Sequence, residues 1–110
     1  MRKDDAIRLR HMRDAALEAR SFVSGKRRAD LERDRMLTLS LVKCIEIIGE
    51  AAAQMSDDGR KDLPGIPWPS IIGMRNRLIH AYFDVDLDRV WDSVVDDLPP
   101  LLAEIERVLS

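Results

Sequence analysis

The stretch that decides the fold is residues 37–55, LTLSLVKCIEIIGEAAAQM. Its apolar residues recur every three or four positions, the spacing at which side chains return to one face of an α-helix: Leu37, Leu41, Cys44, Ile45, Ile48, Ala51, Ala52 and Met55. The pattern predicts a long helix, capped by Asp30 and ending near Ser56, whose apolar face forms the main core. A glycine inside a helix costs about 1 kcal/mol relative to alanine, so we interpret Gly49 as a close helix crossing.

A second helix is predicted on the N-terminal side of this stretch. Asp4 or Asp5 can cap it, its apolar stripe continues to Val23, and Gly25 ends it. The basic run 26–28, Lys-Arg-Arg, then connects it to the long helix.

On the C-terminal side, residues 56–69 are rich in Asp, Gly and Pro and predict a loop. A third helix should begin near residues 67–70 and run to about Phe83, with Trp68 filling the space between loop and core. Gly73 suggests another close backbone approach. Asp86 should cap a fourth helix, and Asp96 or Asp97 a last one, with Pro99 and Pro100 in its first turn. Without any strand pattern, we expect an all-α bundle of four or five helices, forming a single domain over residues 1–110.

Composition and charge place the chain among soluble globular proteins, because 45% of its 110 residues are hydrophobic and 35% are charged. No apolar run approaches the roughly 20 residues that span a membrane, and the N-terminus lacks a signal-peptide core. We therefore expect a cytoplasmic protein, and the single Cys44, which cannot form an internal disulfide, agrees with a reducing compartment. Residues 1–35 carry 11 basic and 7 acidic side chains, and residues 36–110 carry 7 and 13. Either a directional field that steers a polyanion or ordinary solvated helix faces would explain this split.

The third predicted helix carries the most polar constellation. If it continues to Phe83, Tyr82, Arg75, Asn76 and His80 lie at about −20°, 0°, 100° and 140° around it and share one side. One turn apart on the long helix, Glu46 and Glu50 would repel each other. We expect an Arg75 or Arg77 partner there rather than a metal, since no Glu-x-x-His motif accompanies the two carboxylates. The other histidine, His11, has no second ligand at metal-binding spacing, and we expect it at the surface.

The pattern Arg75-Asn76-x3-His80-x-Tyr82, with Trp68-Pro69 before it and Asp84-Val85-Asp86 after it, resembles the HEPN ribonuclease superfamily. Within that superfamily it is most similar to HepT toxins of two-gene toxin–antitoxin systems. The likeness extends to four further segments: Ile45–Ala51, Ile66–Trp68, Ile71–Met74 and Val90-Trp91.

RNA can be cleaved without metal when its 2′-hydroxyl attacks the adjacent phosphate. His80 suits the proton transfers because imidazole titrates near neutral pH, and Arg75 offers a planar fork for phosphate. Asn76 can orient the imidazole or donate to the phosphate. We therefore predict an RNA endonuclease that needs no metal or other cofactor, with Arg75 and His80 as catalytic residues. A non-catalytic helical module that binds nucleotide or docks a nucleotidyltransferase remains the alternative, and a purely structural dimer is a third.

The resemblance implies three further properties. The first is a homodimer with a composite cleft at its interface. The second is a type VII-like toxin role, neutralised by a cognate antitoxin that is a minimal (MNT-type) nucleotidyltransferase. The third is that Tyr82 accepts AMP from that enzyme.

Overall fold

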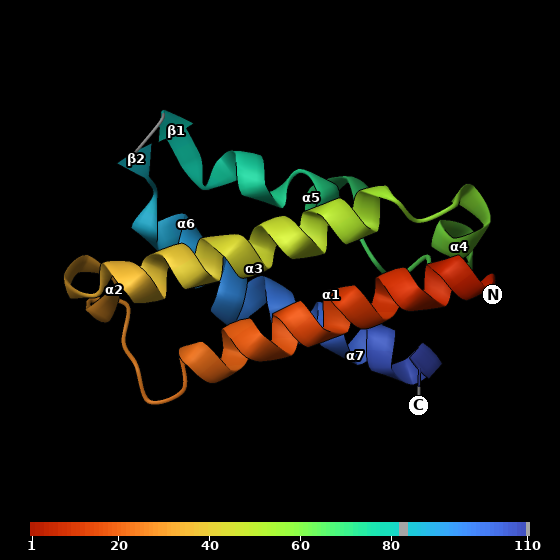
Figure 1. The fold of residues 1–110 in the computed structure, drawn as a ribbon, viewed down its shortest axis with the longest axis horizontal. Helices are drawn as coiled ribbons and strands as arrows, with labels where there is room; N and C mark the ends of the chain where they lie inside the picture. Colours follow the sequence, from red (N-terminus) through yellow and green to blue (C-terminus); the bar gives the residue numbers. More distant parts are fainter. Residues whose placement is uncertain (82–83, 110) are drawn as a thin grey trace.

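The computed structural model describes residues 1–81 and 84–109, and for His80 and Ala81 it describes the backbone alone. Within these residues the all-α expectation is confirmed, apart from one short hairpin. Two long helices, α1 (Lys3–Phe22) and α3 (Arg35–Ala53), lie antiparallel and side by side (Figure 1). Behind them α7 (Leu98–Leu109) packs on α1, and α5 (Trp68–Ile72) runs along α3. None of the described helices is long and apolar enough to cross a membrane.

The predicted helix from Asp30 to Ser56 is two helices. A short α2 (Asp30–Arg33) ends where the backbone of Asp34 turns extended, and the Asp34 carboxylate then caps α3 by accepting from the Leu37 N–H at 3.0 Å. Asp30 does not cap the long helix, because its carboxylate accepts from the Arg27 N–H at 2.7 Å. The stripe from Leu37 to Ala52 is buried as predicted.

The end of the molecule around α4 (Asp57–Asp62) differs from the predicted loop. Ser56 caps this helix, and neither Asp4 nor Asp5 caps α1, whose cap position is Arg2. Asp5 is instead 3% exposed and accepts from the Ser56 N–H at 2.9 Å and from the Ser56 hydroxyl at 2.6 Å. These two hydrogen bonds, the hydroxyl's first, hold the pKa of Asp5 below its usual value. Asp5 therefore bonds to Ser56, 51 residues away along the chain, and not to the free backbone N–H groups at the start of α1.

Two predictions about close packing are confirmed and one is wrong. A Cβ on Gly49 would lie 3.2 Å from the Ile72 carbonyl oxygen, so α3 and α5 cross closely there. Trp68 is 7% exposed, and its indole donates to the carbonyl oxygens of Arg60 and Leu63, which fixes the preceding segment on the core. Gly73 does not approach another element, because its nearest neighbour is the Pro69 carbonyl of its own helix. It ends α5.

The predicted third helix stops at Ile72 and does not reach Phe83. After Gly73 comes a 3₁₀ turn, η1 (Met74–Arg77), followed by the antiparallel strands β1 (Ile79–Ala81) and β2 (Asp84–Val85). Ile79 pairs with Val85, and the Asp86 N–H donates to the Leu78 carbonyl. Met74 and Leu78 are fully buried. The chain therefore leaves the helix here, because Met74 and Leu78 are buried in the core and the following residues pair across the hairpin.

Beyond the hairpin, Asp86 caps α6 (Leu87–Asp92) as predicted, by accepting from the Arg89 N–H at 3.1 Å. The chain then passes through a π-helical turn, η2 (Ser93–Asp97), directly into α7. As predicted, α7 begins directly after Asp97 and has Pro99 and Pro100 in its first turn, but neither Asp96 nor Asp97 forms a capping hydrogen bond with the described residues. Pro99 has no N–H, and its ring would clash with the carbonyl four residues earlier in a regular α-helix. The wider π turn gives that ring room.

Candidate functional site

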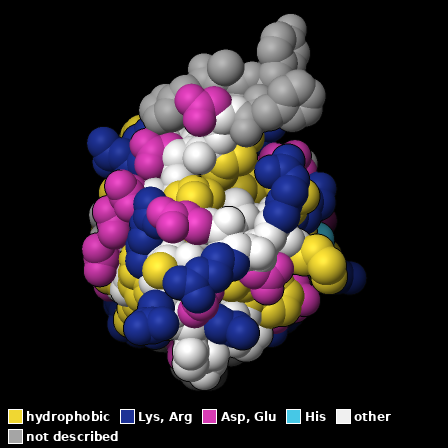
Figure 2. Space-filling model, turned by 90° about the vertical axis from the view of Figure 1, so that its left-hand side faces the viewer, with side chains coloured by type: hydrophobic (Ala, Val, Ile, Leu, Met, Phe, Trp, Pro, Cys, Tyr) yellow, Lys and Arg dark blue, Asp and Glu magenta, His cyan; other side chains and the backbone are white. Residues whose placement is uncertain are grey.

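The hairpin end of the molecule carries the predicted site. Figure 2 views this end and shows Lys and Arg side chains spread over it, interspersed with acidic ones. Arg75 and Asn76 lie in η1, which packs on α3. Both are exposed, so the turn presents a guanidinium and a carboxamide to solvent.

Arg75 is held by Glu46 of α3. Its Nε donates to Glu46 Oε1 at 2.9 Å, with side-chain exposures of 50% for Arg75 and 23% for Glu46. Of the two arginines predicted as possible partners for the carboxylates of α3, Arg75 is therefore the one that pairs with Glu46. Within the described part of the chain, neither terminal nitrogen of Arg75 has a hydrogen-bond partner. The geometry leaves the outer edge of the guanidinium open to a ligand oxygen.

Glu46 is more firmly placed than a typical surface carboxylate. It lies in the middle of α3, and Lys43 approaches its second oxygen at 4.0 Å. An ion pair this exposed contributes about 1 kcal/mol or less to stability. Its main structural effect is therefore the orientation of Arg75.

Arg77 turns the opposite way. Its two terminal nitrogens donate to the hydroxyl and the carbonyl of Ser70, at 3.2 and 3.1 Å. It borders a cleft of about 460 Å³ between residues 65–71 and the start of α7. Burial raises the pKa of Asp97 on the same cleft, and the charge of Arg77 partly offsets that rise. The two arginines of one turn thus serve two different surfaces.

The other predicted site residues are only partly placed. The backbone of His80 lies in β1, while its side chain and all of Tyr82 lie outside the described residues. The shared helical face expected for Arg75, Asn76, His80 and Tyr82 is wrong, because the chain leaves the helix after Ile72. Arg75 instead lies in the 3₁₀ turn, and the backbone of His80 lies in the strand after it.

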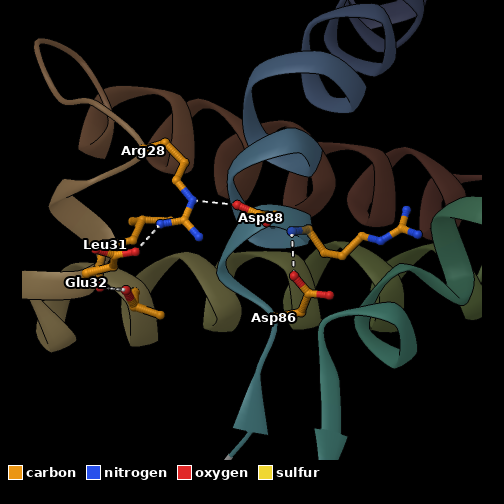
Figure 3. A network of polar contacts seen from close by, with 7 residues as sticks. Arg28, Leu31, Glu32, Asp86 and Asp88 are labelled. Carbon is orange, nitrogen blue, oxygen red and sulfur yellow. Dashed lines mark hydrogen bonds and ion pairs between the residues drawn. The ribbon is translucent and has the colours of Figure 1, made fainter.

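Sequence reasoning missed a polar network beside this site. Arg28 donates to Asp88 of α6 at 2.6 Å and to Glu32 of α2 at 2.8 Å, as Figure 3 shows. It thereby ties the connector between α1 and α2 to the helix that follows the hairpin. Asp88 is 60 residues along the chain from Arg28, so no local pattern could have indicated the contact.

A metal site requires several ligating side chains close together, and a reactive thiol requires a lowered pKa. No three His, Cys, Asp or Glu side chains among residues 1–81 and 84–109 gather closely enough to hold a metal ion. Cys44 is 4% exposed, and burial raises the pKa of its thiol, which agrees with the inert role expected of it. His11 is exposed, as predicted.

Comparison with known proteins decides the family. Residues 12–108 match the family described as "Ribonuclease HepT-like". The chain belongs to this family. A "Probable ribonuclease HepT" from Thermococcus cleftensis is 37% identical over 75 residues, 68% of each chain. Two proteins named "Putative RNase" are similar as well. The one from Methanocaldococcus jannaschii is 37% identical over 68% of this chain and 69% of its own length. The one from Caldanaerobacter subterraneus is 34% identical over 80% and 79%.

No solved structure gives a significant match to the chain. The family and these relatives are named for ribonuclease activity.

Proposed function

We propose that this HepT-like protein is a metal-independent RNA endonuclease whose catalytic residues are Arg75 and His80. The observation that carries the proposal is the state of Arg75. Its Nε is fixed by Glu46, and its terminal nitrogens have no other partner in the described part of the chain. A guanidinium held at its inner edge and open at its outer edge suits two oxygens of a phosphodiester. Membership of a ribonuclease family supports the same assignment.

The proposed reaction uses the RNA's own nucleophile. A base takes the proton of the 2′-hydroxyl, the 2′-oxygen attacks the adjacent phosphorus, and the bond from phosphorus to the 5′-oxygen breaks. An acid returns a proton to that 5′-oxygen, which leaves a cyclic phosphate and a free 5′-hydroxyl. His80 serves in proton transfer, and Arg75 stabilises the charge that builds on the phosphate. Asn76, exposed on the same turn, orients the imidazole or donates to the phosphate.

A homodimer completes this scheme. Each chain supplies one histidine in the motif, whereas the reaction has two proton transfers. A two-fold axis close to η1 and β1 would bring two copies of Arg75 and His80 into one cleft. The single motif histidine of each chain and the two proton transfers together support this dimer.

We further propose that cleavage makes the protein a toxin in the cytoplasm, neutralised by a cognate MNT-type nucleotidyltransferase. That enzyme would transfer AMP to Tyr82, seven residues beyond Arg75. The added AMP carries a phosphate, an anion of the kind that the Arg75 guanidinium would bind, and its nucleoside adds bulk. Tyr82→Phe should therefore cleave RNA almost normally and escape silencing by the enzyme and ATP. Intact-mass measurement would show AMP added to the parent, and equal modification of Tyr82→Phe would overturn this assignment.

Cleavage itself is tested with purified protein, labelled RNA and EDTA. The parent should cut RNA and leave DNA intact, because DNA lacks the 2′-hydroxyl. His80→Ala should slow cleavage by roughly 10²–10⁴-fold, and Arg75→Ala should cause a loss of similar size. Arg77→Ala is the matched control, because it removes an exposed arginine from the same turn that is bonded to Ser70 instead.

Two outcomes would contradict the proposal. Undiminished cutting by His80→Ala would remove the histidine from the chemistry. No cutting of any RNA, together with tight nucleotide binding, would favour the non-catalytic docking module. Sedimentation of an active parent as a monomer at micromolar concentration would contradict the composite cleft alone.

A further inference from the structure

A second hollow lies between the C-terminal end of α1 and the helix after the hairpin. Its volume is about 450 Å³. Its lining combines cations, hydroxyls and an indole: Arg20, Ser21, Val23, Ser24, Lys26, Trp91 and Val95. No carboxylate occurs among these described lining residues, although the protein as a whole has a net charge of −2. This combination of groups is suited to a nucleotide, which has an apolar ring and an anionic phosphate.

Trp91 supplies the aromatic surface. It is half-buried, packed on the core, and the rest of its side chain borders the hollow. The second tryptophan, Trp68, is 7% exposed and hydrogen-bonded through its indole N–H, so it takes no part here. Stacking of a base on an aromatic side chain is worth about 1–3 kcal/mol and tolerates any base.

Lys26 and Arg20 supply the positive charge. Lys26 is exposed and forms no ion pair within the part of the chain that the structure describes, although its charge helps to lower the pKa of nearby Asp30. That carboxylate is already engaged by the Arg27 N–H. Arg20 donates one long hydrogen bond, 3.4 Å, to the Val94 carbonyl, which leaves further N–H groups for a phosphate.

The hollow is held in shape by Arg28. This residue ties the connector that carries Lys26 to Asp88 of α6 (Figure 3). Asp88 and Trp91 are three residues apart on that helix and therefore lie on neighbouring parts of its surface. The basic connector and the indole are thus fixed relative to each other before any ligand arrives.

We infer that this hollow binds a single-stranded segment of RNA, with a base stacked on Trp91 and the backbone phosphates on Lys26 and Arg20. The inference extends the proposed function, since the bound segment would belong to the strand that is cut. Trp91 lies five residues after Asp86, about 7.5 Å along a helix. Asp86 bonds back to Leu78, between η1 and β1, so a short length of α6 connects the base of the hairpin to the indole that borders the hollow.

The test measures binding without cleavage. A strand of about ten nucleotides of 2′-O-methyl RNA, which has no attacking hydroxyl, is titrated into the protein while tryptophan fluorescence is recorded. We expect quenching that disappears in Trp91→Phe, where Trp68 still emits. Lys26→Ala should weaken binding and lower the slope of log affinity against log salt by about 1. The matched control is Lys61→Ala, an exposed lysine of α4 at the other end of the molecule.

Each other outcome would overturn the inference. Equal quenching in Trp91→Phe would exclude stacking at this indole. Equal weakening by Lys61→Ala would mean diffuse attraction without a site. AMP binding as tightly as the strand would identify a free-nucleotide site. Because the 2′-O-methyl strand cannot be cut, a negative binding result would not affect the proposal that Arg75 and His80 are catalytic. Conversely, His80→Ala should lose cleavage and still bind this strand as the parent does.

Discussion

The two ends of the molecule use charge in opposite ways. At the α4 end, the Asp5 carboxylate is buried and its two oxygens accept hydrogen bonds from Ser56. At the hairpin end, Arg75 and Lys26 are exposed. Neither the terminal nitrogens of Arg75 nor the ammonium group of Lys26 has a partner in the described residues. A carboxylate that is fully bonded can only stabilise the fold, whereas a cation with open donors can still bind a ligand.

The difference also appears in how closely each end is packed. A Cβ on Gly59 would lie 2.5 Å from a carboxylate oxygen of Asp5, so no space remains there. The hairpin end has two hollows, of about 450 and 290 Å³. We therefore expect substitutions at the α4 end to reduce stability and spare activity, and substitutions at the hairpin end to do the reverse.

The largest expected effect on stability is that of Gly59→Ala. The new methyl group must displace the Asp5 carboxylate and break its bonds to Ser56, which costs about 1–3 kcal/mol. Alanine regains about 1 kcal/mol of helix propensity, so urea unfolding should show a net loss of up to about 2 kcal/mol with cleavage unchanged. The same substitution in an Asp5→Ala protein should cost much less. Equal losses in both backgrounds would mean that Gly59 does not act through Asp5.

Glu46→Gln should show the opposite pattern, with a loss of activity and little change in the free energy of unfolding. The amide keeps an acceptor for Arg75 Nε but loses the charge, so Arg75 should be less well oriented. We expect kcat/KM for RNA to fall by roughly tenfold, equivalent to about 1.4 kcal/mol, while unfolding changes by less than about 1 kcal/mol. Glu50→Gln, an exposed carboxylate one turn further along α3, is the control. An unchanged rate in Glu46→Gln would show that its bond to Arg75 does not serve catalysis.

The smallest effect is a pH dependence at Asp5. Its pKa is lowered in the folded protein by the bonds from Ser56. Its ionised form therefore stabilises the fold above the unfolded pKa of about 4, and that contribution is lost as pH falls through the folded pKa. Relative to Asp5→Asn, the parent's advantage in unfolding free energy should be steady from pH 7 to 5 and shrink below about pH 4. Parallel curves down to pH 2 would contradict the assigned cause.

Features with a local or periodic signal were predictable from the sequence. The apolar stripe of α3, the close crossing at Gly49 and the Asp86 cap all follow from residue spacing. Glu46 and its cation were predictable because two carboxylates one turn apart need a positive neighbour.

Features that depend on distant partners were not predictable. Asp5 resembles a helix cap in sequence, yet its partner Ser56 comes from another helix. The hairpin depends on burial of Leu78 and on the pairing of Ile79 with Val85, which no helical period indicates. As a result, Arg75 was predicted as one of two candidate partners of Glu46, the other being Arg77, but on the wrong kind of element.

The position of the two chain ends has a practical consequence for experiments. α1 begins at Lys3 and α7 ends at Leu109, and Figure 1 shows both ends of the chain on the side away from the hairpin. A protein immobilised on a bead or sensor chip through either terminus would therefore hold the hairpin away from the support. Strand association could then be followed on a tethered molecule without steric interference from the attachment point.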